Sequence, residues 1–163
     1  MNSPDTETLR ACYVESRQQL FTYALSIAGN RESAEDAIQG AFQQILRRGA
    51  LPADLRPYVF RCVRNAAVDA LRRANVRRDS IFDVAGAADA NAPDAPLAHE
   101  SDELERCLRQ LSPDERETIV LKIYDDFSFD EIATLRQVPL PTAASWYRRG
   151  LDKLKSILAA DIR

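Results

Sequence analysis

Three short stretches of this chain carry residues able to do chemistry, and the first of them is acidic. Glu35 and Asp36 stand side by side, with Gln39 and Gln43 following at helical spacing. Paired carboxylates can act as a general acid and base or bind a metal ion. No histidine, third ligand or glycine-rich loop accompanies them, so catalysis here is disfavoured. A polar, acidic helix face of this kind is more often exposed to solvent or a docking surface for a basic partner.

The second stretch is basic and contains aromatic residues. Tyr58 and Phe60 are interleaved with four arginines, namely Arg61, Arg64, Arg72 and Arg73. Aromatic rings beside arginines can hold the unstacked bases of single-stranded DNA, at roughly 1–3 kcal/mol for each stacked base. The alternative is that both rings belong to a hydrophobic core and that the arginines only keep the protein soluble. These residues alone leave both interpretations open.

The third stretch, near the C-terminus, combines hydroxyl groups with cations. Thr142, Ser145 and Arg149 are spaced by three and four residues, which places them along one face of a helix. Asp152 is the only acid opposing the other nearby cations, which are Arg148, Lys153 and Lys155. Hydroxyls and arginine on one stripe suit base edges and phosphates. The alternative is a solvated amphipathic helix with its basic residues near its C-terminus.

Cysteine and histidine usage argues against a metal site. Cys12, Cys62 and Cys107 are scattered and form no Cys-x-x-Cys pair, and His99 is the only histidine. A zinc or iron–sulfur site needs a denser set of ligands. We therefore expect no metal, no cofactor and no catalytic residue, and we interpret the cysteines as reduced, buried thiols.

Charge is distributed very unevenly along the chain. The overall net charge is −3, but residues 55–78 hold seven arginines against one aspartate, whereas residues 79–107 hold eight acids against one arginine. A clustered basic segment favours local contact with nucleic acid. A mildly acidic protein binds DNA poorly in a non-specific way, which indicates help from a partner.

Helical periodicity dominates the first half of the chain, and no strand pattern appears. One helix is expected from about residue 9 to 28, ending at Gly29, and a second is capped by Asn30 with apolar residues from 34 to 45 on one face. A third runs from 54 or 55 to about 73, with its inward positions ending at Leu71. Residues 79–100 then carry few large apolar groups and are interpreted as a flexible linker.

The remaining residues predict a second helical domain. A helix is expected from about Ser101 to Leu111, and capping boxes at Ser112 and Ser128 each predict the start of another. A last helix carries Thr142 through about residue 158. A short helix, a tight turn and a longer helix form the outline of a helix-turn-helix. The fold class is therefore all-α, with small helical domains at 5–76 and 101–161 and an acidic linker at 77–100.

The chain has no run of about 18 apolar residues, so a membrane-spanning helix is not expected. Its N-terminus has neither a basic nor an apolar leader segment, so no secretory signal is expected. We predict a cytoplasmic protein without membrane insertion.

Three segments together resemble one protein family, the extracytoplasmic-function (group IV) sigma factors of bacterial RNA polymerase. Residues 34–42, AEDAIQGAF, are similar to the family's polymerase-binding helix, and residues 55–73, LRPYVFRCVRNAAVDALRR, to its promoter-melting helix. Residues 111–117, 127–133 and 142–145 are similar to its fourth region. The segments occur in the family's order on both sides of the linker and cover nearly the whole chain.

The resemblance implies a protein that binds core RNA polymerase and promoter DNA, directs promoter recognition and strand opening, and is not itself an enzyme. An anti-sigma factor is a further candidate partner, and a nucleoid-associated location in the bacterial cytoplasm follows. The residues implied for polymerase binding are Glu35, Asp36, Gln39 and Gln43. Those implied for the minus-ten element are Arg56, Tyr58, Arg61, Arg64, Asn65, Arg72 and Arg73. Those implied for the minus-thirty-five element are Thr142, Ser145, Trp146, Arg148, Arg149 and Lys153.

Four positions depart from the family pattern. Tyr58 stands in place of the usual tryptophan and Gly40 in place of an acid, while Ala144 and Trp146 occupy positions that are commonly lysine and arginine. The loss of two cations weakens phosphate anchoring. Trp146 is interpreted as partly buried in the core, the alternative being that it packs on the DNA. The rival hypothesis is a sigma-like adaptor or decoy that binds a regulator without reading DNA. The arginine cluster of the second stretch argues against it.

Overall fold

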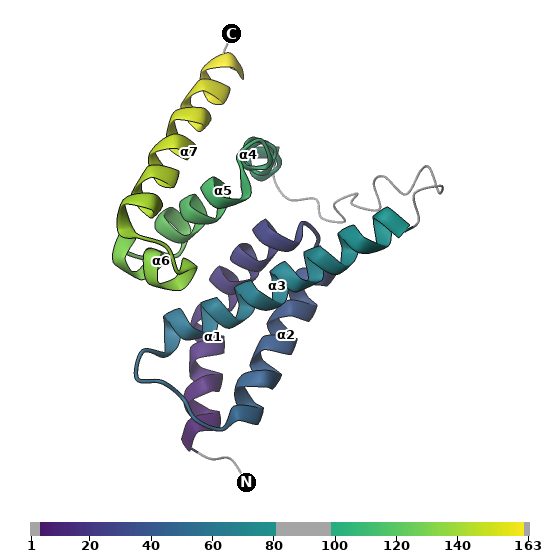
Figure 1. The fold of residues 1–163 in the computed structure, drawn as a ribbon, viewed down its shortest axis with the longest axis vertical. Helices are drawn as coiled ribbons and strands as arrows, with labels where there is room; N and C mark the ends of the chain where they lie inside the picture. Colours follow the sequence, from purple (N-terminus) through teal and green to yellow (C-terminus); the bar gives the residue numbers. More distant parts are fainter. Residues whose placement is uncertain (1–3, 81–98, 162–163) are drawn as a thin grey trace. The chain divides into compact units, whose positions relative to one another are not determined.

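A computed structural model describes residues 4–80 and 99–161, all of whose regular structure is helical (Figure 1). The chain divides into two compact units, Met1–Ala92 and Pro93–Arg163. The predicted all-α class is confirmed for the described residues. The predicted linker falls mostly at residues 81–98, which lie outside them. No helix in the described ranges is long and apolar enough to cross a membrane.

The first unit is a bundle of three helices, α1 (Pro4–Ala28), α2 (Arg31–Arg48) and α3 (Leu55–Ser80). The predicted end of α1 at Gly29, the cap of α2 at Asn30 and the start of α3 near residue 55 are confirmed. Asn30 caps α2, its side-chain oxygen accepting a hydrogen bond from the backbone N–H of Ser33 at 2.8 Å. Gly29 and Gly49 follow α1 and α2 with φ of 87° and 73°, the left-handed conformation that glycine adopts without a Cβ clash.

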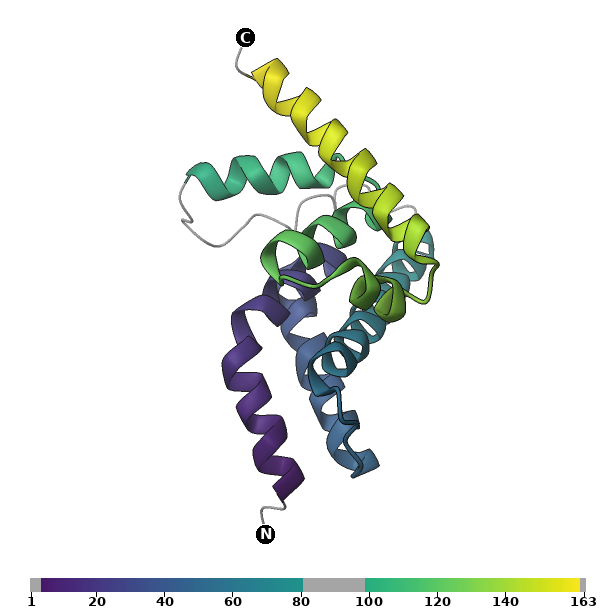
Figure 2. The ribbon, with the colours of Figure 1, turned by 90° about the vertical axis from the view of Figure 1, so that its left-hand side faces the viewer.

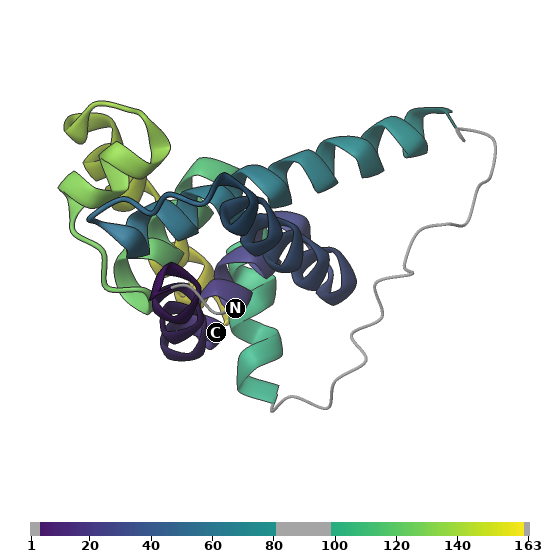
Figure 3. The same ribbon diagram turned by 90° about the horizontal axis from the view of Figure 1, so that it is seen from below.

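The third helix is longer than predicted. It was expected to end near Arg73, with the linker beginning at residue 77, but α3 continues through Ser80. Residues 74–80 contain neither glycine nor proline, so nothing in this segment stops the helix. Residues 71–77 are all exposed, and Leu71, predicted to face inward, is 36% exposed. The last turns of α3 therefore extend beyond the hydrophobic core of the bundle (Figure 3).

The core of the first unit is made by large side chains from all three helices. Its fully buried members include Leu20 and Tyr23 of α1, Ile45 of α2, and Val59 and Phe60 of α3. The rings of Tyr23 and Phe60 pack with their centroids 5.7 Å apart. This core holds α2 and α3 in place, so their exposed faces have fixed positions within the unit.

The second unit contains α4 (His99–Arg109), α5 (Pro113–Ile119), the π-helical turn η1 (Val120–Tyr124), α6 (Phe129–Arg136) and α7 (Leu140–Asp161). Both predicted capping boxes are confirmed. Ser112 and Glu115 exchange side-chain and backbone hydrogen bonds at the start of α5, as do Ser128 and Glu131 at the start of α6. Helix α4 begins two residues before the predicted start at Ser101 and ends two residues before the predicted end at Leu111.

A helix-turn-helix is formed by α6, the turn at Gln137–Pro139 and α7 (Figure 2). Gln137 ends α6 with φ of 55°, and α7 begins two residues before the predicted Thr142. Gly150 is buried where α7 crosses α5, and a Cβ added there would lie 2.5 Å from Ile119 Cδ1. This glycine allows α7 to pack closely on α5, which sets the position of the N-terminal half of α7.

Candidate nucleic-acid interface

The acidic stretch lies on the exposed face of α2. Glu35, Asp36, Gln39 and Gln43 are all exposed, whereas Ala34, Ala37, Ile38, Ala41 and Ile45 of the same helix are buried. Glu35, Gln39 and Gln43 recur every fourth residue and form one stripe, with Asp36 on the adjacent one. The structure therefore brings the four predicted docking residues together on a single surface.

A groove of about 910 Å³ lies between α1 and α2, alongside these residues. Its apolar walls include Leu9 and Ile38 and the ring pair Tyr13 and Phe42, whose centroids are 5.2 Å apart. Its polar lining is Thr6, Arg10, Arg17, Gln18, Arg31, Glu35, Gln39 and Gln43. Asp36 is outside the groove. An apolar floor with polar edges suits a helix of a partner protein, and the sequence alone did not reveal it because α1 supplies one wall.

Most of the basic stretch follows one face of α3. Arg61 and Arg72 are about three turns apart and so project in nearly the same direction, with Arg64 and Asn65 beside that line. Asn65, Arg72 and Arg73 are exposed, and Arg61 and Arg64 are partly exposed. A row of guanidinium groups on a helix held by a rigid core can track a nucleic-acid backbone.

Arg56 departs from this row. Its guanidinium donates a hydrogen bond to Gln19 of α1 at 3.4 Å and lies 5.4 Å from the centroid of the Phe60 ring. Helical geometry places it roughly opposite Arg61. The structure therefore groups Arg61, Arg64, Asn65 and Arg72 but not Arg56 with them.

The two aromatic residues of the basic stretch have different environments. Phe60 is fully buried against Tyr23, so it belongs to the core, as one of the two alternatives had it. Tyr58 is partly exposed, and its hydroxyl accepts a hydrogen bond from Arg48 at 3.4 Å. Of the two rings, only that of Tyr58 is accessible to a base.

The N-terminal half of α7 presents the third group of predicted residues. Thr142, Ser145 and Trp146 are partly exposed, and Arg148 and Arg149 are exposed. The interpretation of Trp146 as partly buried agrees with this intermediate exposure. The indole ring lies beneath Arg136 of α6, whose guanidinium carbon is 4.8 Å from the ring centroid.

Arg136 was not singled out by sequence reasoning. Its side chain is 6% exposed and forms ion pairs with Asp114 and Glu117 of α5. It therefore links α5, α6 and α7. The only sequence signal was an arginine in the last turn of a short helix, which also fits simple solubility.

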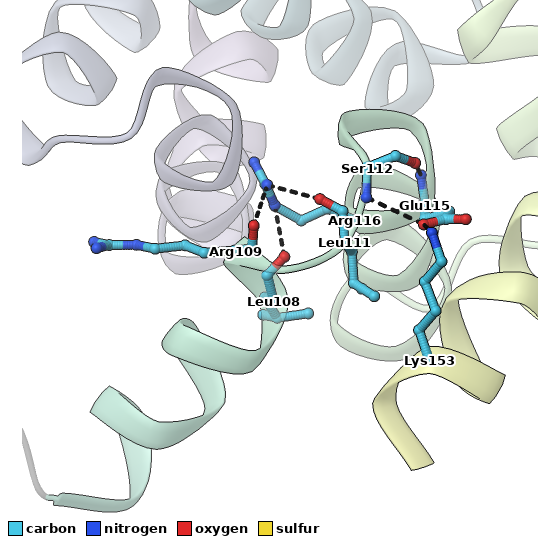
Figure 4. Close-up of polar contacts among 7 residues, drawn as sticks. All are labelled: Leu108, Arg109, Leu111, Ser112, Glu115, Arg116 and Lys153. Atoms are coloured by element: carbon cyan, nitrogen blue, oxygen red, sulfur yellow. Dashed lines mark hydrogen bonds and ion pairs between the residues drawn. The ribbon is translucent and has the colours of Figure 1, made fainter. Parts of the chain in front are cut away.

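Lys153 is engaged inside the second unit. Its ammonium group donates to Glu115 Oε1 at 2.8 Å, and that carboxylate also accepts from the Ser112 backbone N–H at 3.1 Å (Figure 4). Burial by itself would raise the pKa of Glu115, but the hydrogen bonds from Lys153 and Ser112 outweigh it and lower the pKa below its ordinary value. Lys153 thus fastens α7 to the start of α5.

A neighbouring arginine closes the end of α4. Arg116 donates hydrogen bonds to the backbone oxygens of Leu108, Arg109 and Leu111, at 2.9, 3.2 and 3.0 Å (Figure 4). Leu108 and Arg109 lie in the last turn of α4 and Leu111 follows it, where carbonyls lack α-helical hydrogen-bond partners. Arg116 therefore acts as a cap supplied from the next helix.

We expect Lys153→Met to lower the free energy of unfolding of the second unit by about 1 kcal/mol near neutral pH. The charged hydrogen bond contributes less to the free energy of unfolding than a buried one would, because the Lys153 side chain is 51% exposed and solvent screens its charge. Because the pKa of Glu115 is lowered in the folded state, its carboxylate stabilises the folded unit at pH values above the ordinary carboxyl pKa. This stabilisation is lost as the pH falls through the folded-state pKa. The difference between variant and wild type should therefore shrink in acid.

Urea unfolding at several pH values, followed by the fluorescence of the single tryptophan in the second unit, measures this difference. Lys155→Met is the control, because Lys155 is an exposed lysine of the same helix. A variant as stable as wild type at neutral pH, or a difference that grows in acid, would contradict the role of the ion pair.

No group of three or more histidine, cysteine or acidic side chains in the described part of the chain is arranged to hold a metal ion. Cys12 and Cys62 are partly buried in the first unit, and burial raises the pKa of both thiols. Cys107 is buried in the second unit.

Family models match both units. Residues 12–77 match sigma-70 region 2, and residues 101–154 match sigma-70 region 4. The chain is 34% identical over 137 residues to the RNA polymerase sigma factor CarQ of Myxococcus xanthus, covering 79% of this chain and 76% of that protein. The chain belongs to the extracytoplasmic-function sigma factors.

Other relatives agree with this assignment. The chain is 27% identical over 167 residues to the sigma factor EcfG of Rhodopseudomonas palustris, covering 97% of this chain and 89% of the relative. It is also 27% identical to the sigma factor SigE of Mycolicibacterium smegmatis, spanning 58% of that longer protein. As a sigma factor, this protein binds core RNA polymerase and directs it to promoter DNA.

A solved structure with the same fold is the sigma factor RpoE of Bartonella quintana, crystallised with the anti-sigma factor NepR. The TM-score is 0.72 at 21% sequence identity, and the match covers 95% of this chain and 99% of that one. At this identity the likeness concerns the fold. It supports the description of both helical units.

Proposed function

We propose that the two units of this sigma factor divide promoter recognition between them. In the first, comprising residues 5–76, the exposed face of α2 docks on core polymerase through Glu35, Asp36, Gln39 and Gln43. The basic face of α3 captures the opened strand of the minus-ten element. In the second, comprising residues 101–161, α7 enters the major groove of the minus-thirty-five element.

One observation carries this proposal: the acidic docking surface and the basic strand-capturing surface lie on different helices of one rigid bundle. Each can therefore engage its partner without displacing the other. The polymerase supplies the chemistry of RNA synthesis, so we propose that this chain is not an enzyme. Two weak DNA contacts on one polypeptide reinforce each other through effective concentration.

The groove between α1 and α2 extends the proposed docking surface. Its apolar floor adjoins the Glu35, Gln39 and Gln43 stripe, so a polymerase helix packed there would bury apolar surface while its flanks meet polar groups. The location that follows is the bacterial cytoplasm, on nucleoid DNA. An anti-sigma factor is the class of regulator to examine first, since a structural relative is crystallised with one.

In-vitro transcription with purified core polymerase on a randomised promoter library tests the proposal as a whole. We expect transcripts that depend on this chain, from promoters that share two short elements. Polymerase binding without transcripts from any promoter would instead identify a sigma-like adaptor or decoy.

For the second unit, we expect Arg149→Ala to cost roughly 1–3 kcal/mol of promoter affinity and to relax the preference at one base pair, as loss of a base contact does. Arg149 shares a stripe with Thr142 and Ser145 and is exposed. Lys155→Ala is the matched control, because Lys155 is an exposed cation of the same helix that lies off the stripe. Library selection with each holoenzyme measures both the affinity and the base preference. If Arg149→Ala instead lowers affinity equally for all promoter sequences, and this loss fades at high salt, Arg149 contacts a phosphate and not a base.

A further inference from the structure

Trp146 occupies the middle of the stripe that faces DNA in the proposed function. Thr142, Ser145, Trp146 and Arg149 follow the spacing i, i+3, i+4, i+7, which is one face of a helix over two turns. The indole is partly exposed, while the neighbouring Ala143 is fully buried and makes the core contact of that turn. The large ring is therefore not needed to close the core, and part of it remains accessible.

One face of the Trp146 indole packs against the charged guanidinium of Arg136. The Arg136 guanidinium carbon is 4.8 Å from the centre of the ring, and its own position is set by ion pairs with Asp114 and Glu117. A guanidinium is planar, remains charged and stacks on aromatic rings. With its side chain only 6% exposed, Arg136 has little room to move, so it restrains the orientation of Trp146.

This arrangement presents an apolar surface rather than a positive charge to the DNA. The charge of Arg136 is offset by two carboxylates, and the indole offers apolar atoms and a single N–H donor. In the major groove the matching apolar group is the C5-methyl of thymine. Phosphates, in contrast, require cations or N–H donors.

We infer that Trp146 reads thymine methyl groups in the minus-thirty-five element and that Arg136 is its positioning residue. The inference rests on the proposed placement of α7 in the major groove. It assigns a base class to this position, and it makes the contribution of Trp146 nearly independent of salt, because no counterion is released when an apolar contact forms.

Deoxyuridine in place of thymine tests the inference without altering the protein, because it removes only the methyl group. Holoenzyme made with the full chain is titrated with a library-selected promoter in which each thymine of the minus-thirty-five element is replaced in turn. At one or two positions we expect wild type to bind about fourfold more weakly, the equivalent of about 0.8 kcal/mol for one buried methyl group. The ratio of affinities for thymine and deoxyuridine promoters is the readout, since the fraction of folded protein cancels from it.

Variants then assign the effect to the two residues. In Trp146→Ala the ratio should fall to one, and Trp146→Phe should keep part of it. Arg136→Lys keeps the charge but loses the planar stack, so its ratio should fall although polymerase binding is unchanged. Tyr147→Leu is the aromatic control, because the Tyr147 ring packs on Phe129 with centroids 5.3 Å apart, and it should leave the ratio as in wild type.

Two results would overturn the inference. One is a wild-type ratio of one at every thymine, and the other is a ratio that survives Trp146→Ala. If Arg149→Ala still relaxes base preference in either case, α7 reads DNA without Trp146, and the proposed function stands. If replacing Arg149 and replacing Trp146 both leave promoter affinity unchanged, then the inference is wrong and so is the proposed placement of α7 in the major groove.

Discussion

Replacement of Arg61, Arg64, Arg72 and Arg73 by alanine is expected to abolish open-complex formation while leaving polymerase binding intact. Strand opening must be offset by new contacts to the exposed strand, through charge and base stacking. These four arginines are at least partly exposed and lie on α3, whereas the proposed docking residues lie on α2. The two activities should therefore separate cleanly in this variant.

Permanganate footprinting of holoenzyme on a library-selected promoter measures the opened thymines, and a pull-down titration measures polymerase binding. The charge control also removes four positive charges, by replacing Arg47, Arg106, Arg109 and Lys155 with alanine, because these are exposed cations on other helices. It should open the promoter like wild type. Normal thymine reactivity in the four-arginine variant would show that these arginines of α3 do not capture the opened strand. If wild type gave no thymine reactivity on any promoter, the result would favour the sigma-like adaptor.

The second large effect is expected from Asp36→Arg, which should weaken polymerase binding at least tenfold. Asp36 is exposed on α2 beside the Glu35, Gln39 and Gln43 stripe, and reversing its charge places a cation against a partner surface that complements an acid. Because an exposed substitution usually changes stability by less than about 0.5 kcal/mol, helicity and the melting temperature should stay at wild-type values.

A matched control comes from the neighbouring helix. Glu15 is an exposed acid of α1 that does not line the groove, so Glu15→Arg makes the same change of charge away from the docking surface. It should bind polymerase as wild type does. If Asp36→Arg and wild type bind polymerase with equal affinity in the titration, this face of α2 is not the docking surface.

Local features of the fold were predicted correctly because their causes lie within a few residues. The Asn30 cap and the capping boxes at Ser112 and Ser128 each join groups three residues apart. The end of α3 was predicted too early, since the inward apolar pattern ends at Leu71 and a scarcity of large apolar groups indicated the linker, although residues 74–80 contain neither glycine nor proline. Composition is thus a weaker guide to a helix end than the presence of glycine or proline.

The sequence by itself determined which residues share a helix face: the proposed docking stripe of α2, the arginine row of α3, and the stripe of α7 that we propose reads DNA. Only the tertiary structure decided that Phe60 is core while Tyr58 is accessible, that α1 and α2 enclose a groove, and that Arg136 lies over Trp146. It also joined Lys153 to Glu115, 38 residues away in the chain. The physical reason is range, since helical periodicity acts over three or four residues, whereas such contacts depend on how whole helices pack against one another.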